Sequence, residues 1–300
     1  SMKQSWFDDS EYLLKNANVT FRQKLRNKGV VRLGYSYKEE LPGLQFLLSN
    51  YALNSYQDFF SGSDDVIKLG NSVFSLNYSL YNDIKGFSIN ASAIHTETHS
   101  GYAEAYTTEN FIFHSSVPTS SGQSTLANVI FTNYFSKLKM ASKIESNQNF
   151  IQSPFSIDQT SEYKLQNYSG DYSLSLSSYY DKWFNFSSGF TYTYASSELG
   201  GDTNSFETSK AFINFDLNIL ESIKVNVSNE LYILNEENYN FVNANIVYEP
   251  QQSRWSGTLQ LNNLLNEREY LYQNINSFKL YQKRIGLVPA YALLSIKYRF

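Results

Sequence analysis

Residues 290–300 read AYALLSIKYRF, with an apolar side chain at every second position. One face of an extended strand carries Ala290, Ala292, Leu294, Ile296, Tyr298 and Phe300. The opposite face carries Ser295, Lys297 and Arg299, with Leu293 as the exception. A soluble sheet packs such an apolar face on a core, whereas a transmembrane barrel turns it to lipid and its polar face to a lumen. The rest of the sequence has to distinguish these two arrangements.

Two-faced segments of the same kind recur from residue 16 onward; Tyr172, Leu174 and Leu176, for example, alternate with serines. Counting the alternation predicts about thirteen strands, at residues 16–26, 30–38, 71–81, 87–96, 126–135, 139–150, 168–180, 183–194, 210–219, 223–234, 239–249, 255–264 and 288–300. The predicted fold class is all-β, an antiparallel transmembrane β-barrel with about 13–14 strands in this chain. Single-chain bacterial barrels normally have an even number of strands, so an odd count indicates a missed strand or part of a larger barrel.

The connections between these segments alternate in length. Short ones lie at residues 26–29, 82–86, 136–139, 181–182, 220–222 and 250–254, and long polar ones at 39–70, 97–124, 151–166, 196–208 and 266–287, with a tighter bend near 235–238. Aromatic residues crowd the strand ends beside the short turns, at Tyr81, Tyr134, Tyr179, Tyr180, Trp183, Phe184, Tyr248 and Trp255. Both features are typical of outer-membrane barrels, which have tight periplasmic turns, long outer loops and aromatic girdles.

Composition excludes several classes of protein. The chain has 25 Tyr and 22 Phe among 300 residues, only 17% charged residues, and no run of about 18 apolar residues that a transmembrane helix needs. A net charge of −4 argues against nucleic-acid binding, and the absence of cysteine excludes disulfides and zinc–thiolate sites. Ser1 before Met2 is interpreted as an expression-vector remnant, so residues 1–15 are assigned to a remnant and lead-in segment and residues 16–300 to the barrel.

Residues 261–272, LNNLLNEREYLY, and residues 281–300, YQKRIGLVPAYALLSIKYRF, resemble the end of a TonB-dependent outer-membrane receptor. In that family the penultimate strand closes on an Asn-Leu-Leu/Phe-Asn stretch, which corresponds here to residues 263–266. The last strand ends on an aromatic residue that the barrel-assembly machinery reads, which corresponds to Phe300, with Tyr298 beside it. The resemblance implies a 22-stranded barrel preceded by a plug domain and a TonB-contacting segment. This chain is then the C-terminal part of the barrel, without the plug.

The stretch HTETH contains the one cluster of metal-ligand residue types. His95, Glu97 and His99 fall on one face of a strand, and imidazoles with a carboxylate suit zinc, copper or iron. The parity of the strand places them on the lipid-facing set, above the hydrocarbon band. A metal site is therefore carried as the weaker interpretation, and an outer-wall polar segment as the stronger.

The long connections carry the candidate ligand contacts. Aromatic and charged side chains there are suited to stack on a sugar or grip a chelate, and the candidates are Tyr51, Tyr56, Arg268, Tyr270, Tyr272, Tyr281 and Arg284. The alternative is that they are solvated loops with some mutual packing. The sequence contains no Gly-x-Ser-x-Gly motif or Gly-rich phosphate loop, so neither an enzyme nor a cofactor is expected.

The sequence thus predicts a Gram-negative outer-membrane protein that contributes barrel wall and extracellular ligand-binding loops to a TonB-dependent nutrient importer. Its expected partners are the lipid bilayer, the barrel-assembly machinery, TonB through the rest of the receptor, and an unidentified nutrient, but no nucleic acid. Two alternatives stay open: a complete small barrel acting as a passive channel or structural protein, and a soluble β-sandwich adhesin.

Overall fold

The computed structural model describes residues 13–26, 28–47, 52–55, 58–63, 66–108, 112–119, 122–157, 161–180, 183–234, 237–276 and 279–299. Within them lie eighteen strands and one short 3-10 helix, η1 (Leu44–Leu47). No helix in this part of the chain is long and apolar enough to cross a membrane. The all-β class expected from the alternation is confirmed.

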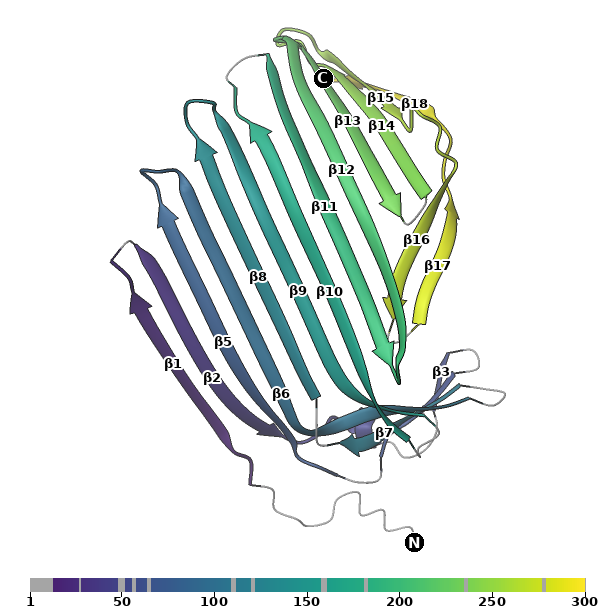
Figure 1. Ribbon diagram of the computed structural model, residues 1–300. Helices are drawn as coiled ribbons and strands as arrows, with labels where there is room; N and C mark the ends of the chain where they lie inside the picture. Colours follow the sequence, from purple (N-terminus) through teal and green to yellow (C-terminus); the bar gives the residue numbers. More distant parts are fainter. Residues whose placement is uncertain are drawn as a thin grey trace.

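One antiparallel meander dominates the structure, and we call it the wall (Figure 1). Thirteen of the sixteen strands of the main sheet pair in the order in which they follow one another along the chain, and β3, β4 and β7 lie off this path. The wall strands are β1 (Asn16–Lys24), β2 (Gly29–Glu40), β5 (Leu69–Asn82), β6 (Phe87–Thr108), β8 (Gly122–Phe135), β9 (Met140–Ile157), β10 (Ser161–Ser178), β11 (Phe184–Leu199), β12 (Asp202–Leu220), β13 (Ile223–Leu234), β14 (Glu237–Tyr248), β15 (Trp255–Asn262) and β18 (Tyr291–Tyr298). Each overlaps one of the thirteen strands expected from the sequence.

The wall is an open, curved sheet with β1 at one edge and β18 at the other (Figure 1). The short turns gather at one end of the strands, the short-turn end, and the long connections at the other, the long-loop end. No pairing joins β1 to β18 among the residues that the structure describes, so these residues form a sheet and not a closed barrel. The backbone of each edge strand is paired on one side.

Much of what the sequence predicts as long loops is strand. β9 and β10 continue together to Ile157 and Ser161, and β11 and β12 to Leu199 and Asp202. In these extensions both faces carry polar side chains, so the period-two signal disappears although the backbone hydrogen bonds continue. Gly200 and Gly201 make the tightest of these turns, with φ of 63° and 96°, which matches a two-residue hairpin turn.

Further strands lie at the long-loop end. β7 (Ile112–Thr119) pairs antiparallel with β6 and parallel with β4 (Asp58–Ser61), which also pairs with β3 (Ala52–Ser55). β16 (Glu269–Asn276) and β17 (Lys279–Gly286) form a separate hairpin inside the connection between β15 and β18. The hairpin lies against the ends of β11 and β12.

Candidate functional site

The register of the wall sorts side chains onto two faces. One cross-strand row joins Phe21, Leu33, Leu76 and Ala93 on β1, β2, β5 and β6, and another joins Val225, Ile246, Leu259 and Leu294 on β13, β14, β15 and β18. We call the face that carries these rows the apolar face. Its large side chains stay open to the surroundings also on interior strands, with exposed fractions of 44% for Leu76, 53% for Leu174 and 46% for Phe190.

No element among the described residues covers the middle of the apolar face. The few buried apolar side chains instead lie toward the long-loop end: Ala103, Ala105, Phe155, Leu165, Leu234 and Tyr239. A soluble protein rarely exposes an apolar patch of more than a few hundred Å², and larger patches mark contact with a membrane or with protein. The apolar face is therefore the first candidate for a functional surface.

The opposite, polar face is held together by side-chain hydrogen bonds that cross the strands. Thr193 Oγ1 donates to Asp171 Oδ1 at 2.6 Å, and Asn226 Nδ2 donates to Asp216 Oδ1 at 2.6 Å. Asn128 Nδ2 likewise donates to Asn147 Oδ1. Amides, hydroxyls and carboxylates of this kind suit contact with water or with a polar domain, which is the inner environment of a barrel.

Aromatic rings flank the apolar face at both ends. At the short-turn end the rings of Trp255 and Tyr298 lie 4.7 Å apart. Toward the long-loop end the structure brings together four tyrosines, with ring distances of 6.0 Å and 6.4 Å within its two pairs, Tyr168–Tyr194 and Tyr172–Tyr192. The second group was not recognised from the sequence. The signal was present, since Tyr168 and Tyr172 share the parity of Leu174.

The separation of the two aromatic zones matches the thickness of a membrane. On β11, Phe184 at the short-turn end and Tyr194 toward the long-loop end share the apolar face and stand ten positions apart. At about 3.3 Å per residue and a strand tilt of about 40°, this is about 25 Å along the membrane normal. The apolar band of outer-membrane barrels is about 25 Å tall.

The Asn-Leu-Leu-Asn stretch after β15 closes the connection that leads to β18. Asn263 is 8% exposed and adopts a φ of 54°. Its Nδ2 donates to the carbonyl oxygens of Glu267 at 2.6 Å and Val288 at 2.9 Å, and its Oδ1 accepts from the Glu267 amide at 2.9 Å. One side chain therefore ties the start of the connection to its end. The sequence resemblance identifies this stretch but does not indicate its structural role.

The β16–β17 hairpin brings several of the candidate ligand residues together. The Tyr270 ring packs at 5.2–6.4 Å from three rings of the polar face, those of Tyr232, Tyr239 and Phe241. Arg284 forms ion pairs with Glu269, at 3.0 Å, and with Glu237. Tyr270 and Arg284 thus hold the hairpin on the wall.

The remaining loop candidates differ in their positions. Tyr272 and Tyr281 pair across the hairpin with their rings 6.4 Å apart, and both are exposed. Arg268 is also exposed. These three side chains are available for a ligand. Tyr51 and Tyr56 lie outside the described residues.

Two pKa values reflect the contacts of the hairpin. The hydrogen bond from Tyr239 lowers the pKa of the Glu237 carboxyl, and Arg284 lowers it further. Burial raises the pKa of the Tyr270 hydroxyl. The carboxylate form of Glu237 is therefore the form that the docked hairpin stabilises.

The three HTETH residues share the apolar face, but they do not converge on one point. His95 Nε2 lies 3.6 Å from Glu97 Oε1, and His95 Nδ1 lies 2.8 Å from Thr125 Oγ1. His99 sits at a shift of register between β5 and β6, with its Nε2 2.7 Å from Ser72 Oγ. In the described part of the chain no three His, Asp or Glu side chains are grouped to hold a metal ion. The metal site stays a prediction without this support.

The predicted assembly signal is described in part. Tyr298 packs on Trp255, and its hydroxyl accepts from Arg254 Nη1 at 3.4 Å. Phe300 lies outside the described residues.

The solved structures that match this chain do so at low sequence identity. The FrpB iron transporter from Neisseria meningitidis matches 83% of this chain with 45% of its own, at 9% identity and a TM-score of 0.47. The ferripyoverdine receptor of the outer membrane of Pseudomonas aeruginosa matches 88% with 41% of its own, at 9% identity and a TM-score of 0.41. A deletion mutant of the TodX monoaromatic hydrocarbon channel matches 95% with 83% of its own, at 8% identity and a TM-score of 0.30.

The chain therefore spans less than half the length of the first two proteins. No family model matches the sequence, and none of the curated proteins matches it. At identities of 8–9% and TM-scores below 0.5 these matches carry no functional argument, which has to rest on the two faces of the wall.

Proposed function

We propose that this chain is part of the wall of a transmembrane β-barrel in a Gram-negative outer membrane, and that the whole protein is a TonB-dependent nutrient importer. One observation carries the membrane assignment. Thirteen paired strands present a continuous, exposed apolar face between two aromatic zones, opposite a hydrogen-bonded polar face. A barrel wall needs this arrangement, because one face meets lipid while the other meets a lumen.

The backbone supports the same proposal. In lipid every amide and carbonyl group must be paired within the protein, and antiparallel pairing achieves this between all neighbouring strands of the wall. The open edges of β1 and β18 need partner strands in that environment. Additional strands of a larger barrel supply such partners, in accordance with the resemblance of residues 261–300 to the end of a receptor.

Within the proposed importer the parts have separate roles. The apolar face contacts the bilayer, and the polar face contacts the lumen or a plug domain. The hairpins at the long-loop end lie outside the cell, where Arg268, Tyr272 and Tyr281 are exposed for contact with the nutrient. The barrel-assembly machinery reads the end of β18, and TonB acts through the rest of the receptor. No chemical step is assigned to this chain.

The size and location of the native protein test the proposal. An antiserum against the chain is used to probe outer-membrane and soluble fractions, in boiled and unheated samples. A band that shifts on heating, far above the 34.5 kDa of this chain, is expected for a receptor. A heat-shifted band near that mass would contradict the receptor and favour a complete small channel. A band confined to soluble fractions would exclude both.

A further inference from the structure

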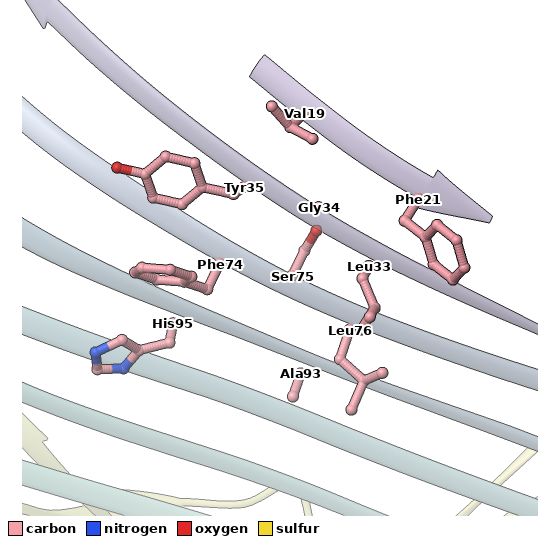
Figure 2. Close-up of a pocket in the computed structure, with 10 residues that line it drawn as sticks. All are labelled: Val19, Phe21, Leu33, Gly34, Tyr35, Phe74, Ser75, Leu76, Ala93 and His95. Atoms are coloured by element: carbon pink, nitrogen blue, oxygen red, sulfur yellow. The ribbon is translucent and has the colours of Figure 1, made fainter. Parts of the chain in front are cut away.

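A groove of about 470 Å³ crosses the apolar face on β1, β2, β5 and β6 (Figure 2). One wall is the cross-strand row Val19, Tyr35, Phe74 and His95, and the other is the row Phe21, Leu33, Leu76 and Ala93. Figure 2 shows the two rows side by side with the groove between them. The lining is almost entirely carbon, and the rings of Tyr35 and Phe74 lie 4.8 Å apart along one wall.

The floor of the groove lacks side chains on the apolar face. Gly34 and Ser75 form the floor with their backbones, since their side-chain positions belong to the polar face. On that face Ser75 Oγ fills the space of a Cβ at Gly34, only 2.5 Å from its ideal position. The floor is therefore backbone, and Ala93 is the small side chain of the apolar face that widens the hollow where one wall meets β6.

Polar groups are concentrated at the edge of the groove that faces the long-loop end. His95 Nε2 lies 3.6 Å from Glu97 Oε1. The hydroxyl of Tyr35 lies 3.5 Å from Ser72 Oγ, which in turn lies 2.7 Å from His99 Nε2. The occupant that fits is an amphiphile, with an apolar chain in the groove and hydrogen-bonding groups beside this edge.

The width of the groove limits what can enter it. Its walls are neighbouring rows of the same strands, two residues and about 7 Å apart. An α-helix with its side chains is about 10–12 Å across and does not fit between them. A single alkyl chain fits, and it gains dispersion contacts from both walls that a flat face does not provide.

We infer that the groove binds one acyl chain of a membrane lipid, with the polar part of that lipid beside His95, Glu97 and Ser72. The inference rests on the proposed function, because it requires the apolar face to meet a bilayer. It also gives the HTETH stretch a role in contacting a lipid headgroup, at the height in the membrane where such groups lie.

Two matched variants test the inference in the full-length protein extracted from outer membranes. Ala93→Phe fills the groove, whereas Ala91→Phe adds the same ring on the same strand and face, opposite Tyr78 and outside the groove. Both variants are first checked for an unchanged heat-shifted band. The lipid that stays bound after detergent washing is then counted by native mass spectrometry.

The retained lipid is expected to fall about tenfold in Ala93→Phe, the factor that corresponds to about 1.4 kcal/mol of binding free energy, and to stay at the wild-type amount in Ala91→Phe. Equal retention in the wild type and both variants would overturn the inference. A detergent-resistant dimer that Ala93→Phe dissociates would also overturn it, because a second copy would then occupy the groove.

A separate readout distinguishes this failure from failure of the proposed function. The chain has no cysteine, so Ala91→Cys carries a fluorophore at one known position. Suppose that lipids brominated on their acyl chains quench the fluorophore while lipid retention is equal in all samples. This result would contradict lipid binding in the groove but support contact of the apolar face with the bilayer. Absence of quenching would contradict the membrane wall and the groove together.

Discussion

The wall and the β16–β17 hairpin are both antiparallel β-structure, but different interactions hold them in place. In the wall the position of a side chain follows from its face, because apolar and polar surroundings lie on opposite sides. In the hairpin the position depends on a few particular contacts, those of Asn263, Tyr270 and Arg284. The wall should therefore respond to the polarity of a substitution, and the hairpin to the loss of individual contacts.

The largest effect is expected from one charge placed on either face of β18. Leu294 lies opposite Leu259 on the apolar face, and its neighbour Leu293 lies opposite Gln260 on the polar face. Leu294→Arg should lower the free energy of unfolding in bilayers by about 2–4 kcal/mol, the cost of an arginine facing the membrane midplane. Leu293→Arg should change it little. Denaturant titration in lipid vesicles measures both, and equal losses would show that the two faces are not distinct.

The next effect concerns the turn at Asn263. Asn263→Gly keeps the positive φ but removes the three hydrogen bonds of the Asn263 side chain. The free energy of opening of the connection should therefore fall by about 2 kcal/mol. Asn266→Gly also keeps a positive φ and loses one hydrogen bond, to the Ala290 amide, and should cost less. Hydrogen exchange of the β16 and β17 amides measures the opening. If both variants exchange like the wild type, Asn263 does not hold the connection.

A smaller effect is expected from the aromatic contacts of the hairpin. Tyr270→Ala removes three ring contacts with the wall. It should lower the free energy of undocking the hairpin by about 1–2 kcal/mol. Tyr272→Ala removes the ring contact with Tyr281 inside the hairpin and should leave it docked. Spin labels on β12 and β17 report the distance between hairpin and wall. If both variants give the same distance distribution, the Tyr270 ring contacts do not hold the hairpin on the wall.

The smallest effect is a dependence on pH. Tyr239 on the same wall strand and Arg284 on the hairpin both lower the pKa of the Glu237 carboxyl. Only the Arg284 contact depends on docking, so the Glu237 carboxylate stabilises docking at pH values above its ordinary pKa of about 4.3. This stabilisation should be lost as the pH falls through the lowered pKa. The same pair of spin labels should show more undocked hairpin in acid, and Glu237→Gln should remove the change. If the pH response persists in Glu237→Gln, a group other than Glu237 causes it.

The comparison also explains what the sequence could predict. Thirteen strands and the orientation of their faces follow from period-two alternation, since one apolar and one polar face leave that pattern in every wall strand. The extensions of β9–β12 beyond the wall were missed because polar residues on both faces erase it. The contacts of Tyr270 and Asn263 join segments far apart in the chain, through ring packing and hydrogen bonds that no local pattern encodes.

For the candidate site residues, too, the sequence predicts the face of a strand but not the contacts between strands. The spacing of His95, Glu97 and His99 predicts a shared face, but a register shift at His99 and the partner Ser72 separate the three side chains. Residue spacing in one strand predicts a shared face, whereas convergence on one point depends on neighbouring strands.

The central claim is that the apolar face of the wall meets lipid, and a cysteine scan along β10 tests it most directly. Single cysteines at residues 169–176 carry nitroxide labels in the barrel reconstituted in bilayers, and their collision rates with oxygen, which concentrates in lipid, are measured. The account predicts high rates at Tyr172, Leu174 and Leu176 and low rates at the alternate positions. Rates that do not alternate, or that are high on the polar face, would contradict it.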